Sequence, residues 1–208
     1  MNPNLTDYLT ALNDWHYSQY KHPFYRHGIF LNTLDNPGWH LIIKSNGNCE
    51  KIQWIKQEYS DDDWYHLCAS ENIFYSACGT GENNLLCLLH TAAKWLGLPV
   101  GKQSGFDYLS AMNDWYVSQC DGWWEHGNGI SFSTIKIPGW KLSIDDEDAS
   151  GKSDRADFIL TRNQSDQDWY AVKTEHEPSR PEASRLFAAC SNESLLEILA
   201  VSYRWLMK

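Results

Sequence analysis

Three kinds of signal are missing from the sequence, and each absence argues against a class of protein. No stretch approaches about eighteen consecutive apolar residues, so no membrane-spanning helix is predicted. The first twenty residues lack a positively charged region followed by an apolar run, which argues against an export signal. No Lys- or Arg-rich stripe interrupts the formal net charge of -10, which argues against nucleic-acid or anionic-membrane binding. We therefore expect a cytoplasmic protein with a basic partner.

Paired cysteines and recognised metal-ligand spacings are also missing. The six cysteines form no C-x-x-C pair, so in an unexported protein we expect free, mostly buried thiols. They are Cys49, Cys68, Cys78, Cys87, Cys120 and Cys190. Neither His22 with His27 nor Asp121 with Glu125 and His126 has a spacing typical of metal ligands. No metal and no cofactor is predicted.

Aromatic residues, in contrast, are abundant. The 208 residues include 11 Trp and 11 Tyr, and 42% of the chain is hydrophobic. This content is enough to bury one generous core or two small ones, with much of the burial supplied by aromatic rings. Such rings also suit recognition surfaces.

The sequence is an internal duplication. YLTALNDWHYSQY (8–20) and YLSAMNDWYVSQC (108–120) share eight of thirteen positions. The segments 28–39, 61–67 and 83–96 likewise match 129–140, 166–172 and 192–206. The segment 98–105 is rich in turn-forming residues and is interpreted as a linker. The organisation predicted is a first repeat (1–97), the linker, and a second repeat (106–208), packed as a pseudo-dimer.

Each repeat has the pattern of an α+β module. An amphipathic helix opens it, with Asn4 and Asp7, or Ser104 and Asp107, at capping-box spacing. Alternating segments then predict an antiparallel β-meander, and a leucine-rich helix closes each repeat over one face of the sheet. The predicted strands are 29–34, 39–45, 50–58, 64–69 and 73–78 in the first repeat, and 130–135, 140–145, 156–162, 169–174 and 185–190 in the second.

A P-G-W sequence recurs after the first predicted strand of each repeat. Pro followed by Gly predicts a type II turn, in which the glycine needs a positive φ. Trp39 and Trp140 follow these glycines and are expected to pack against the opening helix. Further residues are expected to be part of the scaffold: Trp15 and Trp115 in the core, and Gln19 and Gln119 at the ends of the opening helices.

The segment DWYVSQCDGWWEHGNGISFSTIKIPGW, with the rest of the second repeat, resembles the immunity protein 53 family. The first repeat resembles the same family through LNDWHYSQY, GIFLNTLDNPGW and DDDWYHL. Members of this family are small single-module proteins encoded beside bacterial polymorphic toxins. The resemblance implies that the chain binds and neutralises a toxin without catalysis. The acidic charge suggests a basic toxin, with nucleases as one candidate class. The chain itself is expected to be a monomer or a weak homodimer.

The two repeats differ most after the opening helix, where the second repeat has QCDGWWEHGNGI and the first has KHPFYRHGI. We interpret this variable loop as the partner-binding site. Adjacent tryptophans in an extended segment point to opposite sides, so one of Trp123 and Trp124 should face outward. The candidate residues of the loop are Asp121, Trp123, Trp124, Glu125 and His126. For Glu125 and His126, the alternative to partner contact is a role in local hydrogen bonding within the loop.

Two acidic segments, 60–64 and 145–154, are expected to be loops. Their ordinary role is a solvated turn, and the functional alternative is steering of a basic partner. Asp61, Asp62 and Asp63 are the candidates for that role.

Two other classes of function remain as alternatives. One is an enzyme or small-ligand binder, with Cys120 as a candidate nucleophile. Its pocket would be formed by Gln119, Cys120, Glu125, His126 and Trp140 and would be restricted to the second repeat. The other is a purely structural interaction module that forms a stable oligomer.

Overall fold

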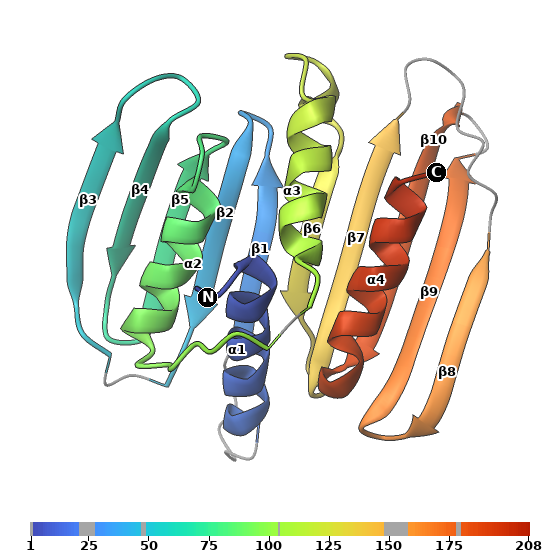
Figure 1. Ribbon diagram of the computed structural model, residues 1–208, viewed down its shortest axis with the longest axis horizontal. Coiled ribbons are helices and arrows are strands. Elements are labelled where there is room, and N and C mark those ends of the chain that lie inside the picture. The colour runs from blue at the N-terminus through green and yellow to red at the C-terminus, as the bar shows by residue number, and fades with distance from the viewer. Residues whose placement is uncertain (1, 21–27, 47–48, 104, 148–157, 178–179) are drawn as a thin grey trace.

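A computed structural model contains four α-helices and a ten-stranded antiparallel sheet within residues 2–20, 28–46, 49–103, 105–147, 158–177 and 180–208, which are the residues that the structure describes (Figure 1). The helices are α1 (Leu5–Gln19), α2 (Asn84–Trp95), α3 (Tyr108–Gln119) and α4 (Leu195–Leu206). The strands of the first repeat are β1 (Gly28–Leu34), β2 (Gly38–Lys44), β3 (Ile52–Glu58), β4 (Trp64–Ala69) and β5 (Ile73–Gly79). Those of the second are β6 (Gly129–Thr134), β7 (Gly139–Glu147), β8 (Ile159–Ser165), β9 (Asp168–Glu177) and β10 (Arg180–Ser191).

The two repeats share one sheet, in the order β3-β4-β5-β2-β1-β6-β7-β10-β9-β8. The predicted meander is wrong, because β2 pairs with β5 while β3 lies at the outer edge. The chain crosses from β2 to this edge and returns through β4 and β5, and β7 to β10 repeat the arrangement. The prediction failed because alternation shows which side chains face the core, not which strands are neighbours.

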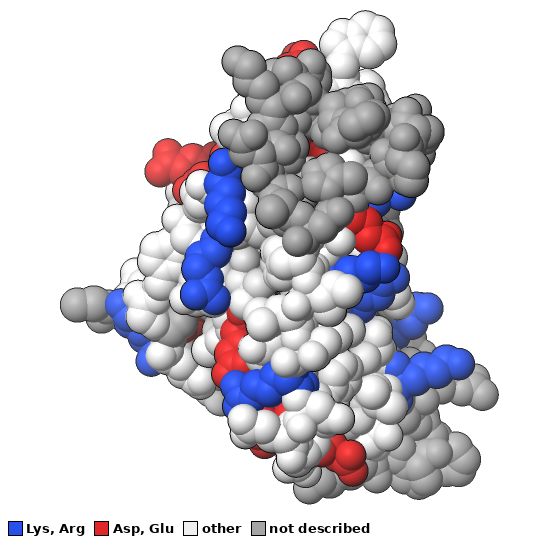
Figure 2. All heavy atoms as spheres, turned by 90° about the vertical axis from the view of Figure 1, so that its right-hand side faces the viewer, with Lys and Arg blue, Asp and Glu red and all other residues white. Residues whose placement is uncertain are grey.

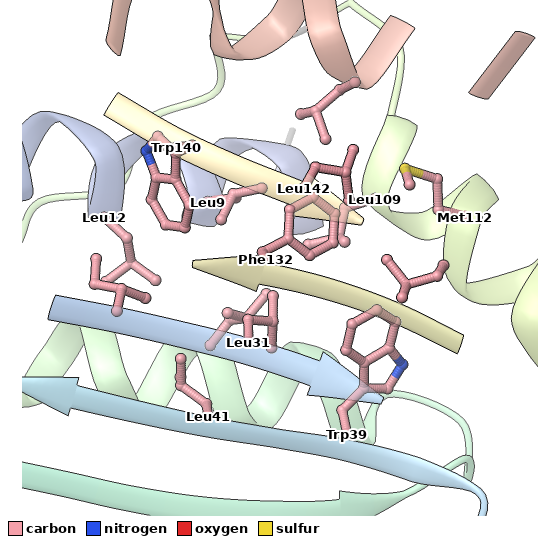
Figure 3. Close-up of a cluster of buried hydrophobic side chains, with 14 of the residues drawn as sticks. Leu9, Leu12, Leu31, Trp39, Leu41, Leu109, Met112, Phe132, Trp140 and Leu142 are labelled. Carbon is pink, nitrogen blue, oxygen red and sulfur yellow. The ribbon is translucent and has the colours of Figure 1, made fainter. Parts of the chain in front are cut away.

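All four helices lie on the same face of the sheet (Figure 1). On that face, alternate residues of the central strands are fully buried, as at Ile29 and Leu31 in β1 and at Leu41 and Ile43 in β2. Figure 3 shows side chains of α1 and α3 meeting those of the central strands, including Leu9 and Leu12 from α1 and Leu109 and Met112 from α3. The opening helices therefore cover the centre of the sheet.

The pairing of β1 with β6 joins the two halves of the sheet. At its centre Leu31 lies opposite Phe132, the residue at the equivalent position of the second repeat. Two equivalent bonds flank this point, in which a backbone N–H of one strand donates to a threonine hydroxyl of the other: Ile29 to Thr134 (3.0 Å) and Ile130 to Thr33 (2.9 Å). The junction thus uses the same contacts in both directions.

Trp39 and Trp140, the tryptophans of the two P-G-W sequences, reach across this junction. The Nε1–H of Trp39 donates to Oδ1 of Asn113 on α3 (2.7 Å), and that of Trp140 donates to Oδ1 of Asn13 on α1 (2.8 Å). The Trp39 ring also packs edge-on against Tyr116, with ring centroids 5.9 Å apart. The predicted contact with an opening helix is confirmed, but each indole is bonded to the opening helix of the other repeat.

The helix starts agree only partly with the predicted capping boxes. The Asn4 and Asp7 box is present, with each side chain accepting from the backbone of the other residue. The second box is wrong, because the N-cap of α3 is Asp107 and not Ser104. Ser104 itself lies outside the described residues.

Asp107 also caps the other opening helix. Its carboxylate accepts from the backbone N–H of Ser110 in α3 (3.1 Å) and from those of Leu5 and Thr6 in α1 (both 3.0 Å). The positive ends of two helix dipoles therefore converge on one carboxylate. This contact fixes where both opening helices start.

The glycines of the P-G-W sequences do not have the conformation of a type II turn. Neither Gly38 nor Gly139 has a positive φ. Instead, an added Cβ would lie 2.1 Å from the carbonyl oxygen of Cys78 at Gly38, and 2.0 Å from that of Cys190 at Gly139. Glycine is required because the neighbouring strand approaches too closely for a side chain.

Removing an amide acceptor beneath one of the buried indoles should destabilise the fold. We expect Asn13→Ala and Asn113→Ala each to lower the free energy of unfolding by about 1–3 kcal/mol, because each leaves a tryptophan N–H unsatisfied. Urea unfolding measures the loss. Asp114→Ala, an exposed change on α3, is the control and should stay within about 0.5 kcal/mol of the parent. Equal stability of Asn13→Ala and Asp114→Ala would contradict the bond's contribution.

The close strand approach predicts a second effect. Gly38→Ala should lower the free energy of unfolding by about 3 kcal/mol, because the backbone must shift to admit the methyl group. Gly101→Ala is the matched control, since an added Cβ there meets no atom within 4 Å. Thermal unfolding of both variants compares them directly, and a Gly38→Ala protein as stable as Gly101→Ala would exclude the steric explanation.

Candidate functional site

The variable loop of the second repeat is shaped by hydrogen bonds to its own backbone. After α3 ends at Gln119, the Asp121 carboxylate accepts from the N–H groups of Trp123 (2.8 Å) and Trp124 (2.9 Å). The bonds from Trp124 and Trp123 lower the pKa of Asp121, because they favour the charged carboxylate. They also start the 3₁₀ turn η1 (Trp124–His126), so this part of the loop is not a strand.

Glu125 holds the other side of the same loop. Its carboxylate accepts from the N–H groups of Asp121 (3.1 Å) and Gly122 (3.0 Å). The residue is only 4% exposed, which leaves little of it for a partner to touch. The structure therefore places Glu125 in the local capping role, while His126, next in the chain, is exposed.

The adjacent tryptophans point in opposite directions. Trp124 packs edge-on against Trp115, with ring centroids 5.5 Å apart, and its Nε1–H donates to Oδ1 of Asp146 (3.3 Å). Trp123 is 84% exposed. The opposite orientation of the two rings was expected, and it arises here from a 3₁₀ turn. Trp124 anchors the loop, and Trp123 is presented to solvent.

Trp140 does not join the other four residues proposed for a small-ligand pocket. Trp140 is fully buried and lies at the start of β7. The loop is attached through Trp124 to Asp146, six residues further along the same strand. At about 3.3 Å per residue this is roughly 20 Å. A pocket that includes both Trp140 and Glu125 is therefore excluded.

The Cys120 thiol has the wrong ionisation state for a nucleophile. Burial raises its pKa to about 11, and the thiol donates to the carbonyl of Tyr116 (3.3 Å). A cysteine nucleophile instead needs a lowered pKa. Burial also raises the pKa of Cys78 and of Cys190 to about 12.

The expectation for the cysteines as a group is confirmed in one respect. All six are free. Burial was predicted for most of them, but only Cys78 and Cys190 are fully buried, and Cys87 on α2 is exposed.

The scaffold residues of the two repeats occupy matching places. Trp115 is buried, and Trp15 packs against the same core. Gln19 and Gln119 are the last residues of α1 and α3, and each side-chain amide donates to the serine before it (3.1 Å).

The acidic segment 60–64 forms the turn between β3 and β4. Asp61 and Asp62 are exposed, whereas Asp63 is half-buried and its carbonyl accepts from the N–H of Tyr59 (2.8 Å). The turn borders a hollow of about 810 Å³. Its lining is Asn36, Trp54, Glu58, Tyr59, Ser60, Asp61, Trp64, His66, Tyr75 and Ala77.

Sequence reasoning placed any pocket in the second repeat and missed this hollow in the first. The hollow could have been predicted from the residues that differ between the repeats in DDDWYHL and DQDWYAV and in the strand before each. In the second repeat, Ile159 stands where the first has Trp54, Asn163 where it has Glu58, and Ala171 where it has His66.

The second acidic segment is not simply a loop. Asp145 and Asp146 lie in β7, where Asp145 pairs with Nε of Arg185 (2.7 Å). Residues 148–154 lie outside the described residues. Figure 2 views the molecule from the β8 side and shows Lys and Arg side chains interspersed with Asp and Glu among the described residues.

The variable loop and the hollow are joined by a short series of contacts. Trp124 packs on Tyr116, whose hydroxyl donates to the Leu34 carbonyl (2.8 Å) and accepts from the N–H of Gly38 (3.3 Å). Asn36, between these two residues, lines the hollow. A loop of the second repeat and a recess of the first thus lie at the same end of the strands, on either side of the turn that carries Asn36.

Among the described residues, no helix is long and apolar enough to cross a membrane. No three His, Cys, Asp or Glu side chains among them are grouped so that they could hold a metal ion.

Comparison with known proteins identifies the repeats. A family model described as immunity protein 53 matches residues 9–97 and again residues 109–206. Neither a curated protein nor a solved structure gives a match.

The raised pKa of Cys120 predicts slow alkylation. Because only the thiolate reacts, Cys120 in the folded chain should react with iodoacetamide at pH 8 on the order of a hundredfold more slowly than in the urea-unfolded chain. Its rate should rise as the pH approaches 11. The folded pKa is raised, so the protonated thiol favours the fold below about pH 9, and this contribution disappears as the pH rises to about 11. Peptide mapping by mass spectrometry measures the site; equal rates in both states at pH 8 would contradict the prediction.

Proposed function

Because the chain belongs to the immunity protein 53 family, we propose that it binds a cognate bacterial toxin and neutralises it by non-covalent association. The family supports an immunity role, and the fold supplies two copies of the module. The observation that carries the mode of action is a tryptophan, Trp123, exposed by 84% on a loop whose backbone is tied down. The toxin would be met in the producing cell or its kin.

The loop is suited to binding because its backbone is already held in one conformation before a partner arrives. Asp121 and Glu125 fix its backbone, and Trp124 attaches it to the core. Affinity is lost when a surface must be ordered on binding, so a preformed loop avoids this cost. An exposed tryptophan on such a support is a typical hot spot. His126 and the exposed side of Asp121 would flank it.

Acid–base or nucleophilic chemistry has no support at this loop. The Glu125 carboxylate is bonded to backbone amides, and the Cys120 thiol is protonated at neutral pH. A binding role therefore accounts for the loop better than a catalytic one.

We further infer that the two repeats form an intramolecular pseudo-dimer acting as one binding unit. The supporting contacts are the β1–β6 pairing and the exchanged Trp–Asn bonds. The formal charge of -10 favours a basic toxin, and exposed Asp61 and Asp62 would accelerate its approach. A nuclease is one class of basic toxin that fits.

The binding role of the loop is tested with the toxin encoded beside the gene. Trp123→Ala should weaken toxin affinity by about thirtyfold or more and should reduce growth rescue on co-expression, because truncating a hot spot costs about 2 kcal/mol or more. Ile159→Ala, at a residue 73% exposed on β8, is the matched control and should bind like the parent. Calorimetry and co-purification measure the effect. If the parent neither rescues growth nor co-purifies with the toxin, the proposed function is wrong.

A further inference from the structure

The hollow of the first repeat lies on the sheet face opposite the helices. Leu67 and Phe74 are buried on the helix-covered face, so their alternating neighbours His66 and Tyr75 project to the other side. Trp54, exposed by 58%, and Trp64 project from β3 and β4 beside them.

Aromatic rings line much of this hollow. The ring centroid of His66 lies 5.7 Å from that of Trp54 and 5.1 Å from that of Trp64. Tyr75 completes the lining on β5, and Tyr59, exposed by 72%, stands at the rim. A wall of π faces left open to solvent favours a cation or an apolar group.

Carboxylates on the same lining decide between these two kinds of occupant. Glu58 and Asp61 both border the hollow. Oε1 of Glu58 lies 2.8 Å from Nζ of Lys56 and 3.1 Å from Nε2 of His66, so its charge is partly balanced. Asp61 is exposed at the rim. The combination of π faces with acidic rim groups is complementary to a positively charged side chain.

The second repeat shows that this chemistry is not a requirement of the fold. Four of its equivalent positions differ, with Ile159 for Trp54, Asn163 for Glu58, Ala171 for His66 and Phe187 for Tyr75, whereas Trp169 and Asp166 retain the residue types of Trp64 and Asp61. The strands nevertheless pair in the same order. The four residues found only in the first repeat, among them Trp54 and Glu58, are therefore not required for strand pairing.

We propose that this hollow binds an arginine or lysine side chain presented by a basic protein partner. The cation lies against Trp54 and Trp64 while Asp61 accepts its hydrogen bonds at the rim. Its place in toxin recognition rests on the proposed function, whereas cation binding by the hollow does not.

A peptide probe tests the hollow without any toxin. Acetyl-tetra-arginine amide is titrated into the full chain, and tetra-citrulline, its uncharged analogue of similar shape, serves as the control peptide. NMR of the indole N–H groups follows each tryptophan. We expect the signals of Trp54 and Trp64 to shift with tetra-arginine, and those of buried Trp39 and Trp140 to stay in place.

Matched variants separate specific binding from general attraction to an acidic protein. Trp54→Ala and Asp61→Asn should each weaken tetra-arginine binding by about fivefold or more, because each removes a direct contact. Asp166→Asn removes the same charge from the equivalent position of the second repeat and should leave the affinity unchanged. Lys56→Ala should tighten binding, since it frees the Glu58 carboxylate.

The outcomes are distinct. Equal binding of tetra-citrulline, or equal weakening by Asp61→Asn and Asp166→Asn, would overturn the proposal. Unfolding midpoints of all variants identify any variant that loses affinity because it loses structure. If Trp54→Ala is destabilised in this way, the affinity of Asp61→Asn decides the outcome. Tetra-arginine binding without toxin neutralisation would reject the proposed function and leave the cation site standing.

Discussion

The structure depends on two buried indole N–H groups, each of which finds its acceptor in the other repeat. A buried N–H without a partner costs about 1–3 kcal/mol, so Trp39 requires α3 and Trp140 requires α1. The opening helices are consequently held over the central strands, with their starts fixed by the shared Asp107 carboxylate. One repeat taken alone has its own tryptophan but lacks the asparagine that satisfies it.

On this common frame the two repeats present different surfaces. The second offers a braced loop ending in exposed Trp123, and the first offers an aromatic hollow with acidic residues at its rim. The two features lie at the same end of the strands, where Tyr116 of α3 is bonded to both ends of the turn that carries Asn36. A partner that engaged both would contact the two repeats at once.

Much of the fold could be predicted from the sequence, because periodicity encodes burial. The helix ends at Gln19 and Gln119 and most strand positions are confirmed. Strand order was not accessible, since the alternation along β2 is the same whichever strand lies beside it. The role of Gly38 was also missed, because the approach of the Cys78 carbonyl depends on β5, far along the chain. In the loop, strand alternation predicted the opposite orientations of Trp123 and Trp124, but these orientations and the burial of Glu125 arise from a 3₁₀ turn that no periodic pattern reveals.

The pairing of Leu31 with Phe132 marks the point where equivalent positions of the two repeats meet. In an assembly of two identical single-repeat chains, these positions would hold the same residue, and every surface change would occur twice. Fusion into one chain removes this coupling. Trp54 and Ile159, or the loop after α3 and its counterpart after α1, are therefore free to diverge separately. Because both repeats keep the same strands and helices in one continuous sheet, the second can carry the exposed tryptophan loop and the first the acidic aromatic hollow without a change of fold.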